Sequence, residues 1–103
     1  MLKIPVGIIQ QIHQAKEAQD LYTHLQAALE LEHSTIPPYL TALYSIQPNS
    51  NQTIAEIIFS VVREEMLHMV IVANVLNAIG GSPQVNKPEF IPTYPGNLPM
   101  VHL

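Results

Sequence analysis

Hydrophobic positions between Thr53 and Gly81 recur at alternating steps of three and four, which is the period of an α-helix with one buried face. Thr53, followed three residues later by Glu56, has the pattern of a capping box. Gly80 and Gly81 can adopt the left-handed conformation that ends a helix. The pattern therefore predicts one long helix with defined ends. Its apolar seam consists of Ile54, Ile58, Val61, Val72, Val75 and Ile79.

A second helical period precedes this one, from about residue 17 to residue 46. Its apolar face consists of Leu21, Leu25, Leu29, Ile36, Leu40 and Leu43. The polar turn at 47–52 is short, so we expect the two helices to be antiparallel neighbours. Three segments follow from this pattern: an arm or short helix at 1–16, a helical hairpin at 17–80, and an extended proline-rich tail at 81–103.

Two consecutive prolines, Pro37 and Pro38, lie inside the first long helix. Proline has no backbone N–H, so the carbonyls of His33 and Ser34 lose their helical hydrogen bonds, and we expect a kink or bulge. The hydroxyls of Ser34 and Thr35 are expected to compensate for part of this loss. Because the apolar period resumes after the prolines, the segment is interpreted as one interrupted helix rather than two.

Two polar residues, Glu65 and His68, lie on the apolar seam of the predicted helix between Thr53 and Gly81. Both lie within roughly 40° of the apolar seam on a helical wheel. A bare E-x-x-H carries little weight, since Glu30 and His33 form another one, and a hydrogen-bonded polar pair remains an alternative to metal ligation. Glu32 strengthens the metal hypothesis, because it faces inward from the partner helix. In dinuclear carboxylate bundles, two helices each supply one Glu and two others each supply Glu-x-x-His.

Composition narrows the chemistry. The 103 residues suffice for one small domain, with 48% hydrophobic and 12% charged residues and a formal charge of −4, so nucleic-acid binding is not indicated. Cysteine is absent, which leaves carboxylate and imidazole as metal ligands. The N-terminal stretch lacks the apolar run of a signal peptide, and Arg63, Glu64 and Glu65 at the centre of the long helix argue against a membrane span. We expect a soluble, cytoplasmic protein.

Two helices with apolar stripes this rich cannot bury them against each other alone. A two-fold homodimer of the hairpin would form a four-helix bundle and would bring together two copies each of Glu32, Glu65 and His68. The alternative is that the chain is half of something larger.

The stretches LQAALELEHSTIPPYLTALYSI, VVREEMLHMVIVANVLNAIGGSP and FIPTYPGNLP resemble the ferritin-like domain of the iminophenyl-pyruvate dimer synthase family, which includes imine-coupling enzymes of violacein and rebeccamycin biosynthesis. The resemblance covers roughly residues 20–103. It implies a ferritin-like helical bundle with carboxylate-bridged metals, with Glu32, Glu65 and His68 at the matching ligand positions. The family's domain continues into a second helical pair with further ligands, so this chain resembles its N-terminal half.

Three functions compete. The first is a ferritin-like, metal-binding protein with iron or manganese, dinuclear if dimeric, and with oxidoreductase-like or oxidative imine-coupling chemistry. The second is a non-enzymatic helical interaction module, or a truncated fragment without metal, whose apolar face docks on a partner. The third is metal storage or delivery. The sequence indicates no substrate.

Overall fold

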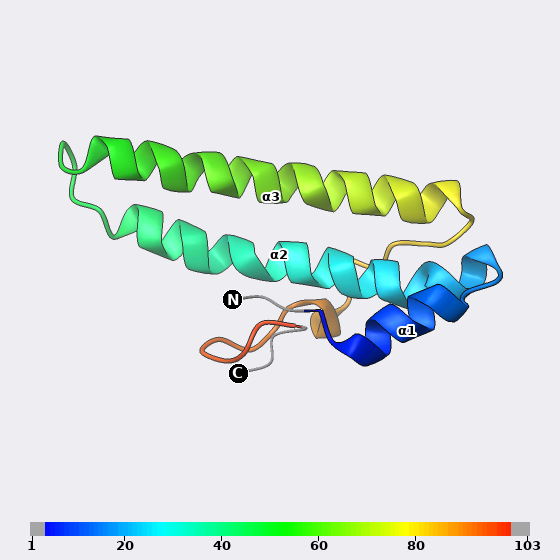
Figure 1. Ribbon diagram of the computed structural model, residues 1–103. Coiled ribbons are helices and arrows are strands. Elements are labelled where there is room, and N and C mark those ends of the chain that lie inside the picture. Colours follow the sequence, from blue (N-terminus) through cyan, green and yellow to red (C-terminus); the bar gives the residue numbers. More distant parts are fainter. Residues whose placement is uncertain (1–3, 100–103) are drawn as a thin grey trace.

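The computed structural model describes residues 4–99, which are largely helical and contain no strand (Figure 1). The two long helices, α2 (Tyr22–Tyr44) and α3 (Gln52–Ala78), run antiparallel along each other and contact each other more extensively than any other pair of elements. A shorter helix, α1 (Val6–Gln14), and a 3-10 helix, η1 (Ala18–Leu21), precede them. The expected all-α helical hairpin is therefore confirmed.

The boundaries of α3 agree with the sequence at one end only. The predicted capping box of Thr53 and Glu56 is wrong: α3 begins one residue earlier, at Gln52, and no side chain caps it. Asn51 precedes it in the left-handed conformation with φ 49°, and this tight turn shifts the start of the helix. The C-terminal prediction is correct, because Gly80 has φ +93°.

The end of α3 forms a Schellman motif. The Gly81 N–H donates to the Leu76 carbonyl at 2.8 Å and the Gly80 N–H donates to the Asn77 carbonyl at 3.1 Å. The hydroxyl of Tyr22, at the start of α2, donates to the Ile79 carbonyl at 3.0 Å. Tyr22 thereby ties the beginning of one long helix to the end of the other.

The helix α2 continues through Pro37 and Pro38 as a single element, in agreement with the sequence. The predicted compensation differs from what is found. The Ser34 hydroxyl donates to the Leu31 carbonyl at 2.7 Å and the Thr35 hydroxyl donates to the Glu32 carbonyl at 2.9 Å, so neither reaches the carbonyls that the prolines leave free. A hydroxyl on a helix reaches back to the preceding turn, not forward to the next one.

The core of the hairpin is small. Its fully buried members are Leu29, Val62 and Leu76, together with the side chain of Ser34. Two residues of the predicted seam of α3 are instead well exposed, Ile54 at 53% and Val75 at 43%. Val75 is exposed because α2 covers one edge of the apolar stripe of α3 and leaves the other edge uncovered, whereas Ile54 lies in the first turn of α3.

We call this uncovered edge the open flank of α3; it consists of Ile57, Glu64, His68, Ile71 and Val75. These positions repeat at steps of three, four and seven, so they share one side of the helix. All five are exposed in the hairpin. Three of its members, Ile57, Ile71 and Val75, are apolar side chains left exposed to solvent.

Beyond Gly81 the chain turns back and crosses α2 on the side away from α3 (Figure 1). A single-turn 3-10 helix, η2 (Pro88–Phe90), buries Phe90 to 6% exposure. Three contacts fix this segment to α2, involving Gln84, Phe90 and Tyr94. None of the helices in residues 4–99 is sufficiently long and apolar to span a membrane.

Candidate metal centre

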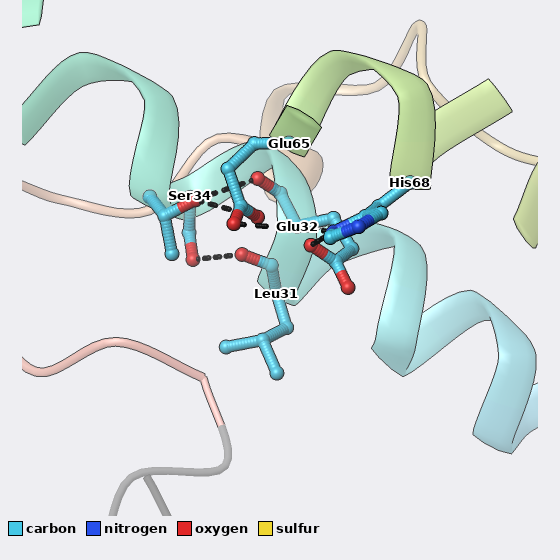
Figure 2. A network of polar contacts seen from close by, with 6 residues as sticks. Leu31, Glu32, Ser34, Glu65 and His68 are labelled. Atoms are coloured by element: carbon cyan, nitrogen blue, oxygen red, sulfur yellow. Dashed lines mark hydrogen bonds and ion pairs between the residues drawn. The ribbon is translucent and has the colours of Figure 1, made fainter. Parts of the chain in front are cut away.

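Three side chains predicted as metal ligands lie together between the middles of the two long helices. Glu32 projects from α2, and Glu65 and His68 project from successive turns of α3 (Figure 2). His68 Nδ1 lies 3.3 Å from a carboxylate oxygen of Glu32 and 3.9 Å from one of Glu65. One ligand atom from each of the three residues lies within 4.8 Å of the others. The hairpin thus brings the three residues into one cluster.

A fourth polar residue, Thr35, belongs to this cluster. Its hydroxyl oxygen lies 3.2 Å from Glu65 Oε2 and 2.9 Å from the Glu32 carbonyl oxygen. A hydroxyl has one proton, so it donates to one of these oxygens at a time. Sequence reasoning assigned Thr35 only to the proline interruption. Its membership of the cluster could have been predicted from its position one turn after Glu32, since residues three apart on a helix share a face.

The two carboxylates interact unfavourably when both are charged. Partial burial, the hydrogen bond to Glu65 and the negative charge of Glu65 raise the pKa of Glu32 from 4.5 to about 7, while His68 lowers it less strongly. Near neutral pH the pair therefore holds a proton that isolated carboxylates would have lost. A metal cation at the same place would remove the need for that proton.

The donor set fits a metal ion. Two ligand atoms bound to one ion at about 2.1 Å can be no more than about 4.2 Å apart. The observed limit of 4.8 Å therefore requires side-chain shifts of only a few tenths of an ångström at each residue. The cluster is open on one side, because the His68 side chain is 45% exposed, whereas those of Glu32 and Glu65 are 26% and 18% exposed.

The other acidic and histidine residues near the cluster remain outside it. Glu30 accepts a hydrogen bond from Gln26 at 3.3 Å on another side of α2. His33 stacks on Phe90, with ring centroids 4.6 Å apart. Glu64 lies on the open flank and is exposed. Of the two E-x-x-H motifs, only the second contributes its histidine to the cluster.

The fold and the site together define a helical hairpin that carries a candidate carboxylate–histidine metal centre between its two long helices. The chain belongs to the ferritin-like family, whose family model matches residues 25–103. This match covers α3, the tail and all of α2 except its first three residues. Searches among curated proteins and solved structures gave no match.

Proposed function

We propose that this chain supplies half of a dinuclear, carboxylate-bridged metal site of the ferritin-like type, with iron as the metal and manganese as the alternative. The observation that carries the proposal is the convergence of Glu32, Glu65 and His68 from two helices. Ferritin-like proteins of the dinuclear class use four carboxylates and two histidines, and this hairpin holds half of that set. Carboxylate and imidazole together suit iron and manganese.

Each side chain has a role that follows from its surroundings. Glu65 is the least exposed of the three and is held by Thr35, so it is suited to bridge two ions. Glu32 would bind one ion from the side, and His68 would bind one through Nδ1, the ring nitrogen that faces both carboxylates. Bound iron would supply one-electron and dioxygen chemistry. The protein residues fix the ligand positions and leave the side next to His68 open.

A second copy of the chain is the partner that we propose for the open flank. A two-fold axis beside His68 would cover Ile57, Ile71 and Val75 and would place a second Glu32, Glu65 and His68 set against the first. The same flank would also accept a second helical pair from a longer polypeptide. In both arrangements a four-helix bundle encloses the metal site.

For the reaction, we propose oxidoreductase-type chemistry, with oxidative coupling of an imine as its specific form. Support comes from the likeness of three sequence stretches to the iminophenyl-pyruvate dimer synthase family, above all EHSTIPPYLTALY around Glu32. The ferritin-like family match supports the fold and the class of site. No residue of the cluster selects a particular substrate.

The test is the metal content of the main size-exclusion peak after anaerobic loading with ferrous iron, compared with a Glu65→Ala variant. We expect about one iron per chain in a dimer-sized peak, and a loss of that iron in the variant. Glu56→Ala serves as the matched control, because Glu56 is an exposed carboxylate of α3 that lies outside both the cluster and the open flank. Iron content equal in the wild type and the Glu65→Ala variant would reject the proposal.

The open flank also favours a second function, a helical interaction module without metal, because Ile57 and Ile71 are 58% and 49% exposed. Under this alternative Glu65 and His68 have no metal to bind and no functional role. Replacing both by Leu would then leave the stability unchanged or increase it. A metal-binding site predicts instead that this double variant loses the stabilisation that added ferrous iron gives to the wild type.

A further inference from the structure

One backbone hydrogen bond of α2 is missing directly beside the metal centre. The Ser34 carbonyl would accept a hydrogen bond from the amide of residue 38 in a regular helix, but Pro38 has no N–H. The hydroxyl of Tyr94 donates to this carbonyl at 2.7 Å. Tyr94 is sixty positions away in the sequence and provides the hydrogen bond that the proline cannot.

Tyr94 belongs to a segment that is attached to α2 at three levels. We call residues 84–94 the strap. At its start, the Gln84 N–H donates to Gln26 Oε1 at 3.0 Å, and Gln26 Nε2 donates to the Gln84 carbonyl at 2.8 Å. In its middle, buried Phe90 stacks on His33. At its end, the Tyr94 hydroxyl donates to the Ser34 carbonyl. The strap therefore runs along the side of α2 that faces away from α3, next to the turns that carry Glu32.

We propose that Tyr94 is a positioning residue for the metal ligands: by completing the α2 backbone at Ser34 it fixes the helical turn that orients Glu32 and Thr35. The inference rests on the proposed metal site. It extends that site to residues 84–94, for which no hydrogen bond or ion pair to the three ligands is found.

The local polar groups explain why one hydroxyl has this effect. Ser34 is fully buried, and its own hydroxyl is already bonded to the Leu31 carbonyl. The Thr35 hydroxyl is shared between Glu32 and Glu65. Without Tyr94 the Ser34 carbonyl would either remain unsatisfied or draw the turn toward water, and both outcomes are costly for a buried backbone group. The turn connects Glu32 to Thr35, so its displacement would move both.

Tyr94 is suited to act as a permanent donor. Burial raises the pKa of its hydroxyl above the ordinary value of 10.0, so the proton is retained throughout the neutral pH range. Tyr94 is 39% exposed, and its hydroxyl forms the hydrogen bond that joins this end of the strap to α2. Phe90 provides the apolar attachment of the strap. Removal of the hydroxyl alone therefore isolates the proposed role.

The first experiment compares Tyr94→Phe with the wild type by titration with Mn²⁺ under anaerobic conditions. We expect the dissociation constant to increase about tenfold, the lower end of the effect of removing an outer hydrogen-bond partner of a metal site. Amide hydrogen exchange of the metal-free protein should accelerate over residues 35–42. Tyr44→Phe is the matched control, because Tyr44 is the last residue of α2 and is 77% exposed. It should change neither readout.

A second variant tests the route through the backbone. Pro38→Ala restores an N–H that can donate to the Ser34 carbonyl, and Pro38 is exposed, so the change removes no core packing. In the Pro38→Ala background, Tyr94→Phe should no longer weaken Mn²⁺ binding. A loss of affinity that Pro38→Ala does not rescue would overturn the proposal, since Tyr94 would then act in some other way. Unchanged affinity and exchange in Tyr94→Phe alone would also overturn it.

The two proposals can fail separately. If the wild type binds no Mn²⁺, the proposed metal site is wrong. Hydrogen exchange alone then tests whether Tyr94 fixes the helical turn that carries Glu32. Faster exchange over residues 35–42 in Tyr94→Phe, restored by Pro38→Ala, would still support its control of the Glu32 turn. If the wild type binds Mn²⁺ and neither readout responds to Tyr94→Phe, the metal site stands and the positioning role is rejected.

Discussion

Replacing Glu32 by Gln should stabilise the metal-free protein at neutral and alkaline pH. Glutamine has the shape of a protonated carboxyl group but cannot acquire a charge. In the wild type, partial burial and the neighbouring Glu65 raise the pKa of Glu32 from 4.5 to about 7. The folded protein thus binds this proton more tightly than the unfolded chain does. The corresponding stabilisation is complete below pH 4.5 and is lost as the pH rises through about 7.

The magnitude follows from the same pair of pKa values. The difference between 4.5 and about 7 corresponds to at most about 3.4 kcal/mol. The Glu32 side chain is 26% exposed, and solvent reduces the repulsion between the carboxylates, so about 1–2 kcal/mol is a more realistic expectation. The stability difference between Glu32→Gln and the wild type should therefore grow in favour of the variant by this amount between pH 4.5 and pH 8.

Urea unfolding followed by circular dichroism, at fixed protein concentration and with a chelator present, measures this difference across the pH range. Glu56→Gln is the control, since it removes an exposed carboxylate of α3 that lies outside both the cluster and the open flank. Addition of Mn²⁺ should reverse the order at pH 8, because only the wild type keeps the full ligand set. A stability difference that does not change with pH would refute the raised pKa of Glu32.

Three further predictions concern the cluster and the end of α3. Thr35→Val removes the hydroxyl beside Glu65 and should weaken Mn²⁺ binding about tenfold by isothermal titration calorimetry, with the metal-free fold retained. Because Glu32 must lose a proton to bind metal, the apparent dissociation constant for Mn²⁺ should rise about tenfold per pH unit below about pH 7; a flat profile between pH 5 and 7 would contradict this. Gly80→Ala places a side chain at φ +93° and 3.0 Å from the Tyr22 hydroxyl, and should lower the free energy of unfolding by about 1–3 kcal/mol in urea titrations.

Sequence periodicity predicted the cluster residues because the signal was local. Glu65 and His68 are one helical turn apart, so their common side follows from helix geometry alone. Glu32 was predicted from its position on an inward face, and a short connection between antiparallel helices makes their mid-points neighbours. The end of α3 at Gly80 could also be predicted from the sequence, because only glycine adopts this positive φ without strain.

Other features depended on contacts that no local pattern encodes. The start of α3 followed the left-handed turn at Asn51 rather than the capping-box pattern at Thr53. Val75 fits the apolar period, yet it is 43% exposed, because burial depends on which side the neighbouring helix covers. The pKa of Glu32 depends on its burial between the helices and on a carboxylate of another helix. Tyr94 lies in the stretch FIPTYPGNLP that resembles the family, but no periodicity or spacing there indicated its contact with α2.

By itself, the sequence determined the all-helical hairpin, the order of its helices and the identity of the three candidate ligands, because these follow from residue spacing along a regular helix. The tertiary structure decided how the hairpin is completed. It placed Thr35 between two carboxylates and the Tyr94 hydroxyl at the gap left by Pro38. These contacts join residues thirty and sixty positions apart, and a hydrogen bond forms only where the packing of whole segments brings donor and acceptor within reach.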